Sequence, residues 1–306
     1  MKGLFVGFLT FCFSVAAPCL AAAQDGDQRF RVEVEAVNLL VTVVDKKTGK
    51  FVKELTADDF EVYEDGVLQE ITNFASETNL PLAIALCIDT SSSVKLKLDF
   101  EKEAAIDFLF TVMRPIDQAL VAEFDTGVTL LHDFTPNPND LVREINRLRA
   151  GGGTSLYDAI YLVSEQKLLN TEGRRTLIVL SDGADLTSKR SFQEALEMAL
   201  RAEAVIYAIS TTRFGAQVDY EGENALKQLT EPTGGQVFFP FSTSEFTKAF
   251  LKIEEELRSQ YSITYVPSNR RRDGSFRKIT VKVKRDGVEV RHRSGYYAPI
   301  EQTVAE

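Results

Sequence analysis

The chain has 306 residues, which is room for about two domains of ordinary size. Charged residues make up 26% and apolar residues 44% of the composition, as in an ordinary globular protein, and this excludes collagen-like, disulfide-scaffold and disordered classes. The formal net charge of -10 disfavours nucleic acid and anionic membranes as partners of the whole chain, although a local basic patch can escape that average.

The first 23 residues have the three parts of a secretory signal peptide. Lys2 precedes the apolar run Leu4–Val15, and the small residues Ala21–Ala23 end the segment. We therefore expect residues 1–23 to be removed, export to the periplasm or out of the cell, and no membrane span in the mature chain. A membrane anchor is the alternative, but Pro18 interrupts the uncharged run and the small-residue site follows it.

The three cysteines leave no pair for an internal disulfide in the mature chain. Cys12 and Cys19 belong to the signal segment, and a lipid on Cys19 is disfavoured because Pro18 stands where a small residue is needed. Cys87 lies within an apolar run, where a buried cysteine acting as a small hydrophobic residue is favoured over a reactive thiol.

Residues 24–79 are predicted to form the first part of a β-rich domain. Apolar residues alternate with polar ones from Phe30 and change phase near Val37, which indicates a β-bulge or a bend. Three local signals follow: a turn at Asp45–Gly49, a capped helical turn at Thr56–Asp59, and a hairpin turn at Asp65-Gly66 between Phe60–Glu64 and Val67–Ile71.

Residues 80–258 change to alternating strands and helices. Short apolar runs predict strands at Leu82–Ile88, Ala119–Phe124, Thr176–Leu180 and Ala204–Ile209. Longer segments with helical spacing follow them at Leu96–Val112, Ser155–Leu169, Phe192–Ala202 and Phe246–Leu257. Continuous apolar strands separated by helices indicate an α/β fold with a doubly wound, mostly parallel sheet.

Strand alternation returns in residues 259–306. The runs Ile263–Val266, Ile279–Val283 and Val288–Val290 predict a small antiparallel meander, with a turn at Asp286-Gly287. Neither flank alone has enough strands for a robust core. We therefore expect residues 24–79 and 259–306 to pack together as one β-sandwich-like domain, with the α/β domain inserted between them. Two independent small appendages are the alternative.

The segment from Ser259 is basic, with ten Lys and Arg against five Asp and Glu, headed by Arg270–Arg272. Many of these charges alternate with apolar residues, so the solvated face and turns of an antiparallel strand are favoured over an acidic-partner site. No pattern of interleaved aromatic and basic residues supports nucleic-acid recognition.

Three polar segments lie at predicted strand or helix boundaries on one edge of the parallel sheet. The first strand ends in Asp89-Thr90-Ser91-Ser92-Ser93, which has the pattern Asp-x-Ser-x-Ser. A Gly-rich loop, Gly151–Gly153, precedes Thr154 at the start of a helix, and Asp182 follows a later strand. Ligand sites in doubly wound sheets lie at the carboxyl ends of strands, so these loops are expected to converge.

These pieces resemble the von Willebrand factor type A domain, whose metal-ion-dependent adhesion site combines Asp-x-Ser-x-Ser with a later Thr and a later Asp. The resemblance covers residues 80–258 and implies a Rossmann-like fold. It implies a metal site formed by Asp89, Ser91, Ser93, Thr154 and Asp182. The flanks are similar to those of a bacterial exported group, in "LTADDFEVYEDG" before the domain and in "GSFRKITVKV" and "RSGYYAP" after it.

The resemblance implies an exported, metal-dependent protein-interaction or adhesion module rather than an enzyme. Two carboxylates and three hydroxyls nearly cancel a divalent charge, which leaves an open metal position for a carboxylate of a protein partner. All-oxygen ligation favours Mg²⁺, with Mn²⁺ or Ca²⁺ possible, over Zn²⁺.

Several alternatives to a metal-dependent adhesion module stay open. The serines after Asp89 could only cap a helix. Gly151–Gly153 could cradle a phosphate, but no Gly-Lys-Ser/Thr ending follows. A metal-dependent hydrolase would need a general base, for which Asp125 is the one candidate. A structural scaffold would use the metal only to hold the loops.

Two further aspartates and the two histidines are kept outside the site. Asp125 is expected to close a hairpin between Leu120–Phe124 and Val128–Leu131, and Asp158 to favour the first turn of its helix. His132 and His292 lie away from the predicted rim, which argues against a His-rich zinc site and a Ser-His-Asp triad.

Overall fold

The computed structural model describes residues 36–76, 80–212 and 219–301. The predicted signal peptide and the strand alternation predicted for residues 30–35 lie outside these ranges, whereas the alternation predicted from Val37 to Val43 lies in a strand, Val37–Asp45, with its four alternating apolar side chains buried. Within the described ranges, no helix is both long enough and apolar enough to cross a membrane.

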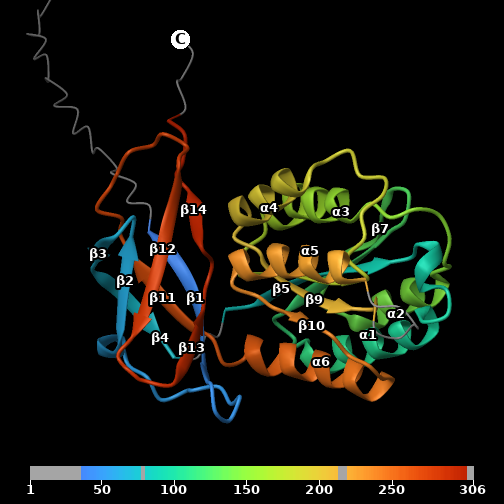
Figure 1. Cartoon of the computed structure of the whole chain (residues 1–306), viewed down its shortest axis with the longest axis horizontal. Helices are drawn as coiled ribbons and strands as arrows, with labels where there is room; N and C mark the ends of the chain where they lie inside the picture. The colour runs from blue at the N-terminus through green and yellow to red at the C-terminus, as the bar shows by residue number, and fades with distance from the viewer. Residues whose placement is uncertain (1–35, 77–79, 213–218, 302–306) are drawn as a thin grey trace, which may run out of the picture. The chain divides into compact units, whose positions relative to one another are not determined.

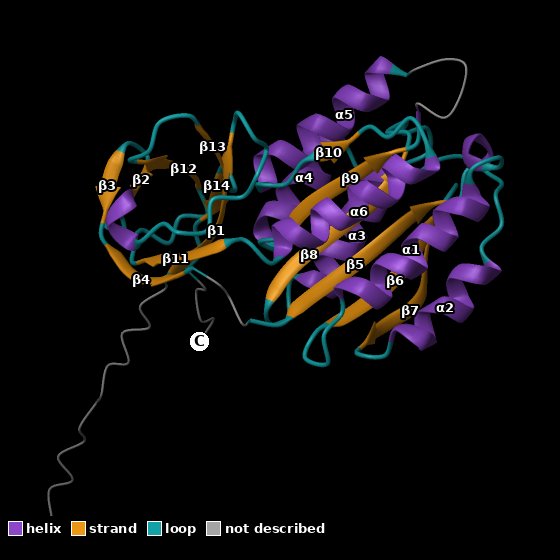
Figure 2. Ribbon diagram, turned by 90° about the horizontal axis from the view of Figure 1, so that it is seen from below, coloured by secondary structure: helices purple, strands orange, loops and turns teal. Residues whose placement is uncertain are grey.

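Figure 1 shows the helices and strands of the whole chain. A six-stranded sheet has the order β10-β9-β8-β5-β6-β7, which can be followed in Figure 2. Neighbouring strands from β10 to β6 pair in parallel, and β7 pairs antiparallel with β6. The strands are β5 (Leu82–Asp89), β6 (Gln118–Phe124), β7 (Val128–Thr135), β8 (Arg174–Ser181), β9 (Val205–Ser210) and β10 (Val237–Phe238). The predicted α/β fold with a mostly parallel sheet is confirmed.

Helices cover both faces of this sheet (Figure 2). Successive side chains of a strand point to opposite faces, and here the apolar side chains on each face pack against helices. Leu86 of β5 belongs to a core with one set of helices, α1 (Leu98–Val112), α2 (Pro138–Arg147) and α6 (Thr243–Leu257). Cys87 belongs to the core on the other face, with α3 (Leu156–Val163), α4 (Phe192–Arg201) and α5 (Tyr220–Thr230). Cys87 is fully buried, and burial raises the pKa of its thiol to about 12, so it is the small hydrophobic residue that the sequence predicts.

Two helices differ from their predicted bounds. The helix predicted from Leu96 begins two residues later, since a 3₁₀ turn occupies Ser92–Val94. The helix predicted to end at Leu169 is α-helical only to Val163 and continues as a π-helical turn over Ser164–Leu168.

Two four-stranded antiparallel sheets are built from strands that lie on either side of the α/β region in the sequence. One has the order β13-β1-β11-β4, with β13 (Val288–Arg291), β1 (Val37–Asp45), β11 (Tyr261–Tyr265) and β4 (Ile71–Ala75). The other has the order β14-β12-β2-β3, with β14 (Gly295–Tyr297), β12 (Phe276–Val283), β2 (Phe60–Glu64) and β3 (Val67–Gln69). Both contribute to one hydrophobic core, in which Val41 and Ile263 of the first sheet join Val62 and Ile279 of the second. The domain boundaries stay a prediction.

The predicted meander in residues 259–306 is wrong. The strands β12 and β13 follow one another across Asp286-Gly287, but they belong to different sheets. Strand β12 pairs with β2 and β14, whereas β13 pairs with β1. Alternation of apolar and polar residues shows which face of a strand is buried, but it does not show which strand is its neighbour.

The local signals of residues 45–69 are formed as predicted. A turn follows Asp45, and the 3₁₀ turn Ala57–Asp59 carries a capping box between Thr56 and Asp59. In the β2–β3 hairpin Glu64 pairs with Val67, and Asp65 and Gly66 have φ angles of 47° and 83°. Positive φ at both central residues is the geometry of the two-residue type I′ hairpin turn.

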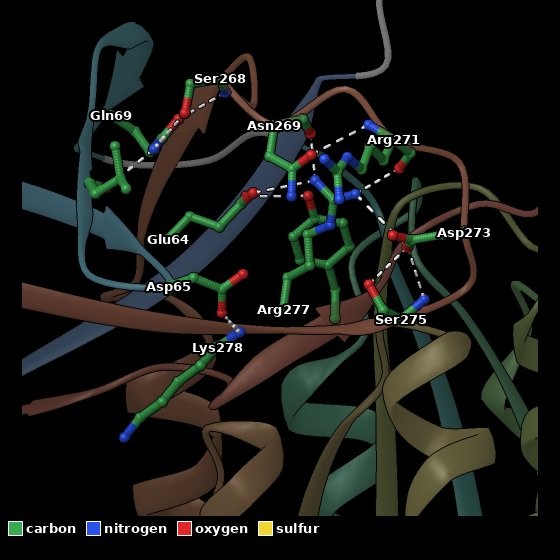
Figure 3. Close-up of polar contacts among 12 residues, drawn as sticks. Glu64, Asp65, Gln69, Ser268, Asn269, Arg271, Asp273, Ser275, Arg277 and Lys278 are labelled. Atoms are coloured by element: carbon green, nitrogen blue, oxygen red, sulfur yellow. Dashed lines mark hydrogen bonds and ion pairs between the residues drawn. The ribbon is translucent and has the colours of Figure 1, made fainter.

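A buried ion pair lies within the second antiparallel sheet (Figure 3). Arg277 on β12 and Glu64 on β2 are 1% and 2% exposed, with 3.3 Å between Arg277 Nη1 and Glu64 Oε1. The hydroxyls of Tyr265 and Tyr296 donate to Glu64 Oε2 at 2.8 and 3.0 Å. The guanidinium also donates to the carbonyl oxygens of Asn269 and Arg271. This network fixes the loop that precedes β12.

Candidate functional site

The candidate site lies where β5 and β8 end, because these parallel neighbours bring their carboxyl ends to one edge of the sheet. Asp89 is the last residue of β5, and Asp182 directly follows the last residue of β8. Two acidic residues that are 93 positions apart in the sequence are therefore brought to the same edge by the strand order.

Asp89 forms the buried floor of the site. Its Oδ1 accepts a hydrogen bond from the Ser91 amide at 2.8 Å, and its Oδ2 accepts one from the Ser181 hydroxyl at 2.8 Å. Asp89 is 0% exposed, and burial raises the pKa of its carboxyl to about 6, with the nearby charge of Asp182 acting in the same direction. Burial without a cation therefore disfavours the charged form of Asp89.

A chain of oxygen contacts joins the two serines to Asp182. Ser91 Oγ and Ser93 Oγ are 2.9 Å apart, and Ser93 Oγ donates to Asp182 Oδ2 at 2.8 Å. The other carboxylate oxygen of Asp182 accepts from the Ala184 amide at 3.1 Å. Ser91 is buried, Ser93 is exposed and Asp182 is half-buried, so the site opens to solvent on the side of Ser93 and Asp182.

The Gly-rich loop is fixed against the Asp-x-Ser-x-Ser loop through backbone hydrogen bonds. The Gly151 amide donates to the Thr90 carbonyl at 2.7 Å, and the Ser92 hydroxyl donates to the Gly152 carbonyl at 3.1 Å. These contacts bring the loop that carries Thr154 to the site. Thr154 is 3% exposed, and its carbonyl oxygen accepts the amide of Leu186 in the loop after Asp182.

Glycine is required at position 152 for two reasons. Its φ of +81° is a conformation that other L-residues rarely adopt, and a Cβ atom there would lie 2.9 Å from Asp125 Oδ2. A larger residue would therefore displace either the Gly-rich loop or the hairpin that carries Asp125.

Asp125 closes its hairpin and Asp158 lies in the first turn of its helix, as the sequence predicts, and Asp158 also holds a neighbouring loop. The Asp125 amide donates to the Gly127 carbonyl and the Gly127 amide donates to Asp125 Oδ1, which closes the β6–β7 hairpin. Asp158 lies in the first turn of α3 and accepts the amides of Lys189 and Arg190. These contacts give both aspartates a structural role.

The histidines lie away from the two strand ends that form the site. His132 is on β7, and its Nδ1 lies 2.7 Å from the Asp133 carbonyl oxygen. His292 follows β13, and its Nε2 accepts the Val281 amide at 3.2 Å.

Two residues near the site were not predicted from the sequence. The hydroxyl of Ser181 donates a hydrogen bond to Asp89 Oδ2. The sequence feature that could have identified Ser181 is its position directly before Asp182. Glu101 on α1 is 0% exposed, and neither of its carboxylate oxygens has a hydrogen-bond partner among the described residues. Burial, followed by the charge of Asp89, raises the pKa of Glu101 to about 8. Glu101 lies on the buried apolar face of α1 with Leu98, Ala105 and Phe108. An acidic residue at an apolar position of the helical pattern is the sequence feature that could have identified it.

The oxygen donors fit a small divalent cation. In octahedral Mg²⁺ coordination at 2.0–2.1 Å, neighbouring ligand oxygens are about 2.9 Å apart. The spacings of 2.9 Å between the two serine hydroxyls and 2.8 Å between Ser93 and Asp182 are of this size. Among the described residues there is no cluster of three or more His, Cys, Asp or Glu side chains suited to a metal. The donor set that the sequence predicts instead consists of two carboxylates and neutral hydroxyls.

Comparisons with known proteins agree with this fold. Residues 84–184 match the model of the von Willebrand factor type A domain. A solved von Willebrand factor type A structure from Catenulispora acidiphila has a TM-score of 0.50 and 14% identity, over 90% of this chain and 76% of that chain. No curated protein matches the sequence.

Two pilus proteins are also similar in structure. The vWF domain of the type V pili tip protein Mfa5 from Porphyromonas gingivalis has a TM-score of 0.49 and 13% identity, over 58% of this chain and 95% of that chain. The PilB minor pilin from Streptococcus sanguinis has a TM-score of 0.48 and 13% identity, over 60% of this chain and 62% of that chain.

The sheet order, the helices on both faces and the polar loops at the strand ends define a doubly wound α/β domain with its candidate site at the carboxyl edge. The match over residues 84–184 places the similarity to the von Willebrand factor type A domain in this α/β region.

Proposed function

We propose that the chain is an exported, metal-dependent protein-interaction module that binds an acidic residue of a protein partner through Mg²⁺ or a similar divalent cation. The observation that carries the proposal is the set of oxygen atoms of Ser91, Ser93 and Asp182, which are linked at 2.8–2.9 Å at the solvent-open side of the site. Export, to the periplasm or the outside of the cell, is proposed from the signal-peptide pattern of residues 1–23.

The residues of this chain would divide the work of holding the cation. Asp89, fixed by Ser181 and by the Ser91 amide, supplies negative charge from the buried side. Ser91, Ser93 and Asp182 supply the oxygens between this floor and the open side, and Thr154, which is buried on the neighbouring loop, is the fifth predicted ligand. A bound divalent cation supplies an electrophile with a free position, for which a carboxylate oxygen is a preferred ligand.

Capture of envelope proteins by the immobilised mature chain tests the proposal. We expect a partner to be retained in Mg²⁺ and released by EDTA, and to be lost with Asp182→Ala, which removes an oxygen donor from the open side. The matched control is Asp107→Ala, because Asp107 is an exposed aspartate on α1. Treating the retained partner to esterify its carboxylates should abolish the capture.

Retention of the same partner in EDTA and by Asp182→Ala would contradict a metal-dependent interaction. If EDTA lowers the melting temperature but leaves the capture intact, the cation only holds the loops. Turnover of a phosphoester or peptide panel in Mg²⁺ that is lost with Asp182→Ala would show a hydrolase instead.

A further inference from the structure

The loops around the candidate site carry large apolar side chains that are open to solvent. Leu96, Leu186 and Tyr220 are 96%, 75% and 75% exposed, and these are the highest values for large hydrophobic side chains among the described residues. Single exposed apolar residues are common on protein surfaces and need no explanation. Here two of the three lie on loops that follow the strand ends of the site, and the third, Tyr220, is the first residue of α5.

The connection of each side chain to the site follows from the chain and from backbone contacts. Leu96 is three residues after Ser93, so their Cα atoms are at most about 11 Å apart. Leu186 is four residues after Asp182, within about 14 Å, and its amide donates to the Thr154 carbonyl at 2.9 Å.

Tyr220 is held near Asp182 by close backbone packing. It begins α5, two residues before Gly222, so the Cα atoms of Tyr220 and Gly222 are at most about 7 Å apart. A Cβ atom built on Gly222 would lie 2.3 Å from the Asp182 carbonyl oxygen. The start of α5 therefore packs directly against the loop that carries a predicted metal ligand.

These distances match the size of a protein interface. A typical partner covers about 800 Å² on each side, which is a disc of about 16 Å radius. The Cα atoms of Leu96 and Leu186 are within this radius of Ser93 and Asp182, and Tyr220 begins the helix whose Gly222 packs on Asp182. Lys95, beside Leu96, is also exposed and adds positive charge, whereas the exposed Asp219 and Glu221 on either side of Tyr220 add negative charge, so an acidic partner residue is favoured on the side of Leu96.

We propose that Leu96, Leu186 and Tyr220 form an apolar collar around the metal site, and that the partner is a protein segment whose acidic residue is flanked by apolar side chains. This inference rests on the proposed function. The cation and Asp182 select the carboxylate, and the apolar collar selects its neighbours. Burial of apolar side chains supplies affinity that a single carboxylate contact lacks.

Two sets of nine-residue peptides test this inference by fluorescence polarisation with the mature chain. Both sets have a central Asp or Glu, flanked by Leu, Phe and Tyr in the first set and by Ser and Gln in the second. In Mg²⁺ we expect the first set to bind at least about tenfold more tightly, because one buried leucine side chain contributes about that much. The double variant Leu96→Ser/Leu186→Ser should reduce the preference to about twofold or less.

Two controls separate the apolar collar from folding and from the metal site. The double variant should bind Mn²⁺ in calorimetry as the unmodified chain does and keep its melting temperature, because both side chains are exposed. Phe110→Ser/Ile116→Ser changes two other exposed apolar residues, at the end of α1 and before β6, and should keep the full peptide preference.

The outcomes distinguish this inference from the proposed function. Equal Mg²⁺-dependent binding of the two peptide sets would overturn the apolar collar and leave the metal-dependent interaction standing. An equal loss of preference in the Phe110→Ser/Ile116→Ser control would also overturn it. Binding that is the same in Mg²⁺ and EDTA, or absent for both sets, would overturn the proposed function and this inference with it.

Discussion

Two buried glutamates show how differently the antiparallel sheets and the α/β domain treat a charge. Glu64 in β2 is 2% exposed and accepts hydrogen bonds from Arg277 and two tyrosine hydroxyls. Glu101 in α1 is 0% exposed, and neither carboxylate oxygen has a hydrogen-bond partner among the described residues. The first carboxylate is compensated within the fold. Burial and the charges of Asp89 and Asp182 raise the pKa of the second to about 8 against the opposing charge of Lys97, so its protonated, neutral form is favoured at neutral pH.

The difference indicates which region is built for stability and which for binding. Burying a charge without a partner destabilises a fold, so such groups are retained mainly where function requires them. The network around Glu64 leads only to a loop of the antiparallel sheets, whereas the electrostatic interactions of Glu101 lead to two predicted metal ligands.

Arg277→Met gives the largest expected effect, because it leaves Glu64 buried without its cationic partner. We expect a loss of about 3–5 kcal/mol in the free energy of unfolding, measured with urea. The double variant Glu64→Leu/Arg277→Met should recover most of this loss, since no buried charge is left. Lys284→Met is the control, because its ion pair with Glu61 spans 4.0 Å between exposed or half-buried side chains and should contribute under about 1 kcal/mol. A loss below about 1 kcal/mol for Arg277→Met would show that the pair contributes little.

Glu101→Gln tests the other side of the comparison through pH. The pKa of Glu101 is raised to about 8 in the folded chain, above its value in the unfolded chain. Between these two pKa values the folded state binds one more proton than the unfolded state, so the free energy of unfolding falls as the pH rises. This group contributes a slope of about 1.4 kcal/mol per pH unit, or about 2–3 kcal/mol between pH 5.5 and 7.5.

The matching measurement is urea unfolding in EDTA at both pH values. Glu101→Gln should reduce the slope, while Glu103→Gln, an exposed residue on the same helix, should leave it unchanged. Asp89, whose pKa is also raised, keeps part of the slope at the acid end of this range. The same slope in the chain with and without Glu101→Gln would mean that Glu101 is not held as an unpaired acid.

The smallest expected effect compares one glycine from each region. Gly66 in the β2–β3 turn has a φ of +83°, and no atom lies within 4 Å of a Cβ built there, so Gly66→Ala adds backbone strain alone. The expected cost is about 1 kcal/mol. Gly127 in the β6–β7 turn is equally open but lacks a positive φ, so Gly127→Ala should change stability by less than about 0.5 kcal/mol. Equal effects in thermal unfolding would mean that the type I′ turn is not strained by alanine.

Much of the fold could be predicted because its signals are local. The run from Leu82 to Ile88 is apolar throughout because both faces of β5 are covered, and Asp65-Gly66 favours a two-residue turn by itself. The pairing of β12 and β13 with different sheets could not be predicted, because their alternation is the same whichever strand is the neighbour.

Part of the site could also be predicted, because its signals are local in the sequence. Asp89, Ser91 and Ser93 form one short motif, and the strand order brings Asp182 to them. Glu101 was missed because an acid in a helix is usually on its solvent face. Its burial and its interaction with Asp89 depend on how α1 packs on the sheet, which the helical spacing alone does not specify.

Calorimetric titration of the metal-free mature chain with Mn²⁺ is the direct test of a divalent-cation site. We expect one binding site, an affinity at least about tenfold weaker with Asp182→Ala, and no change with Asp107→Ala. No binding to the unmodified chain, or the same affinity with Asp182→Ala, would contradict a divalent-cation site at the ends of β5 and β8.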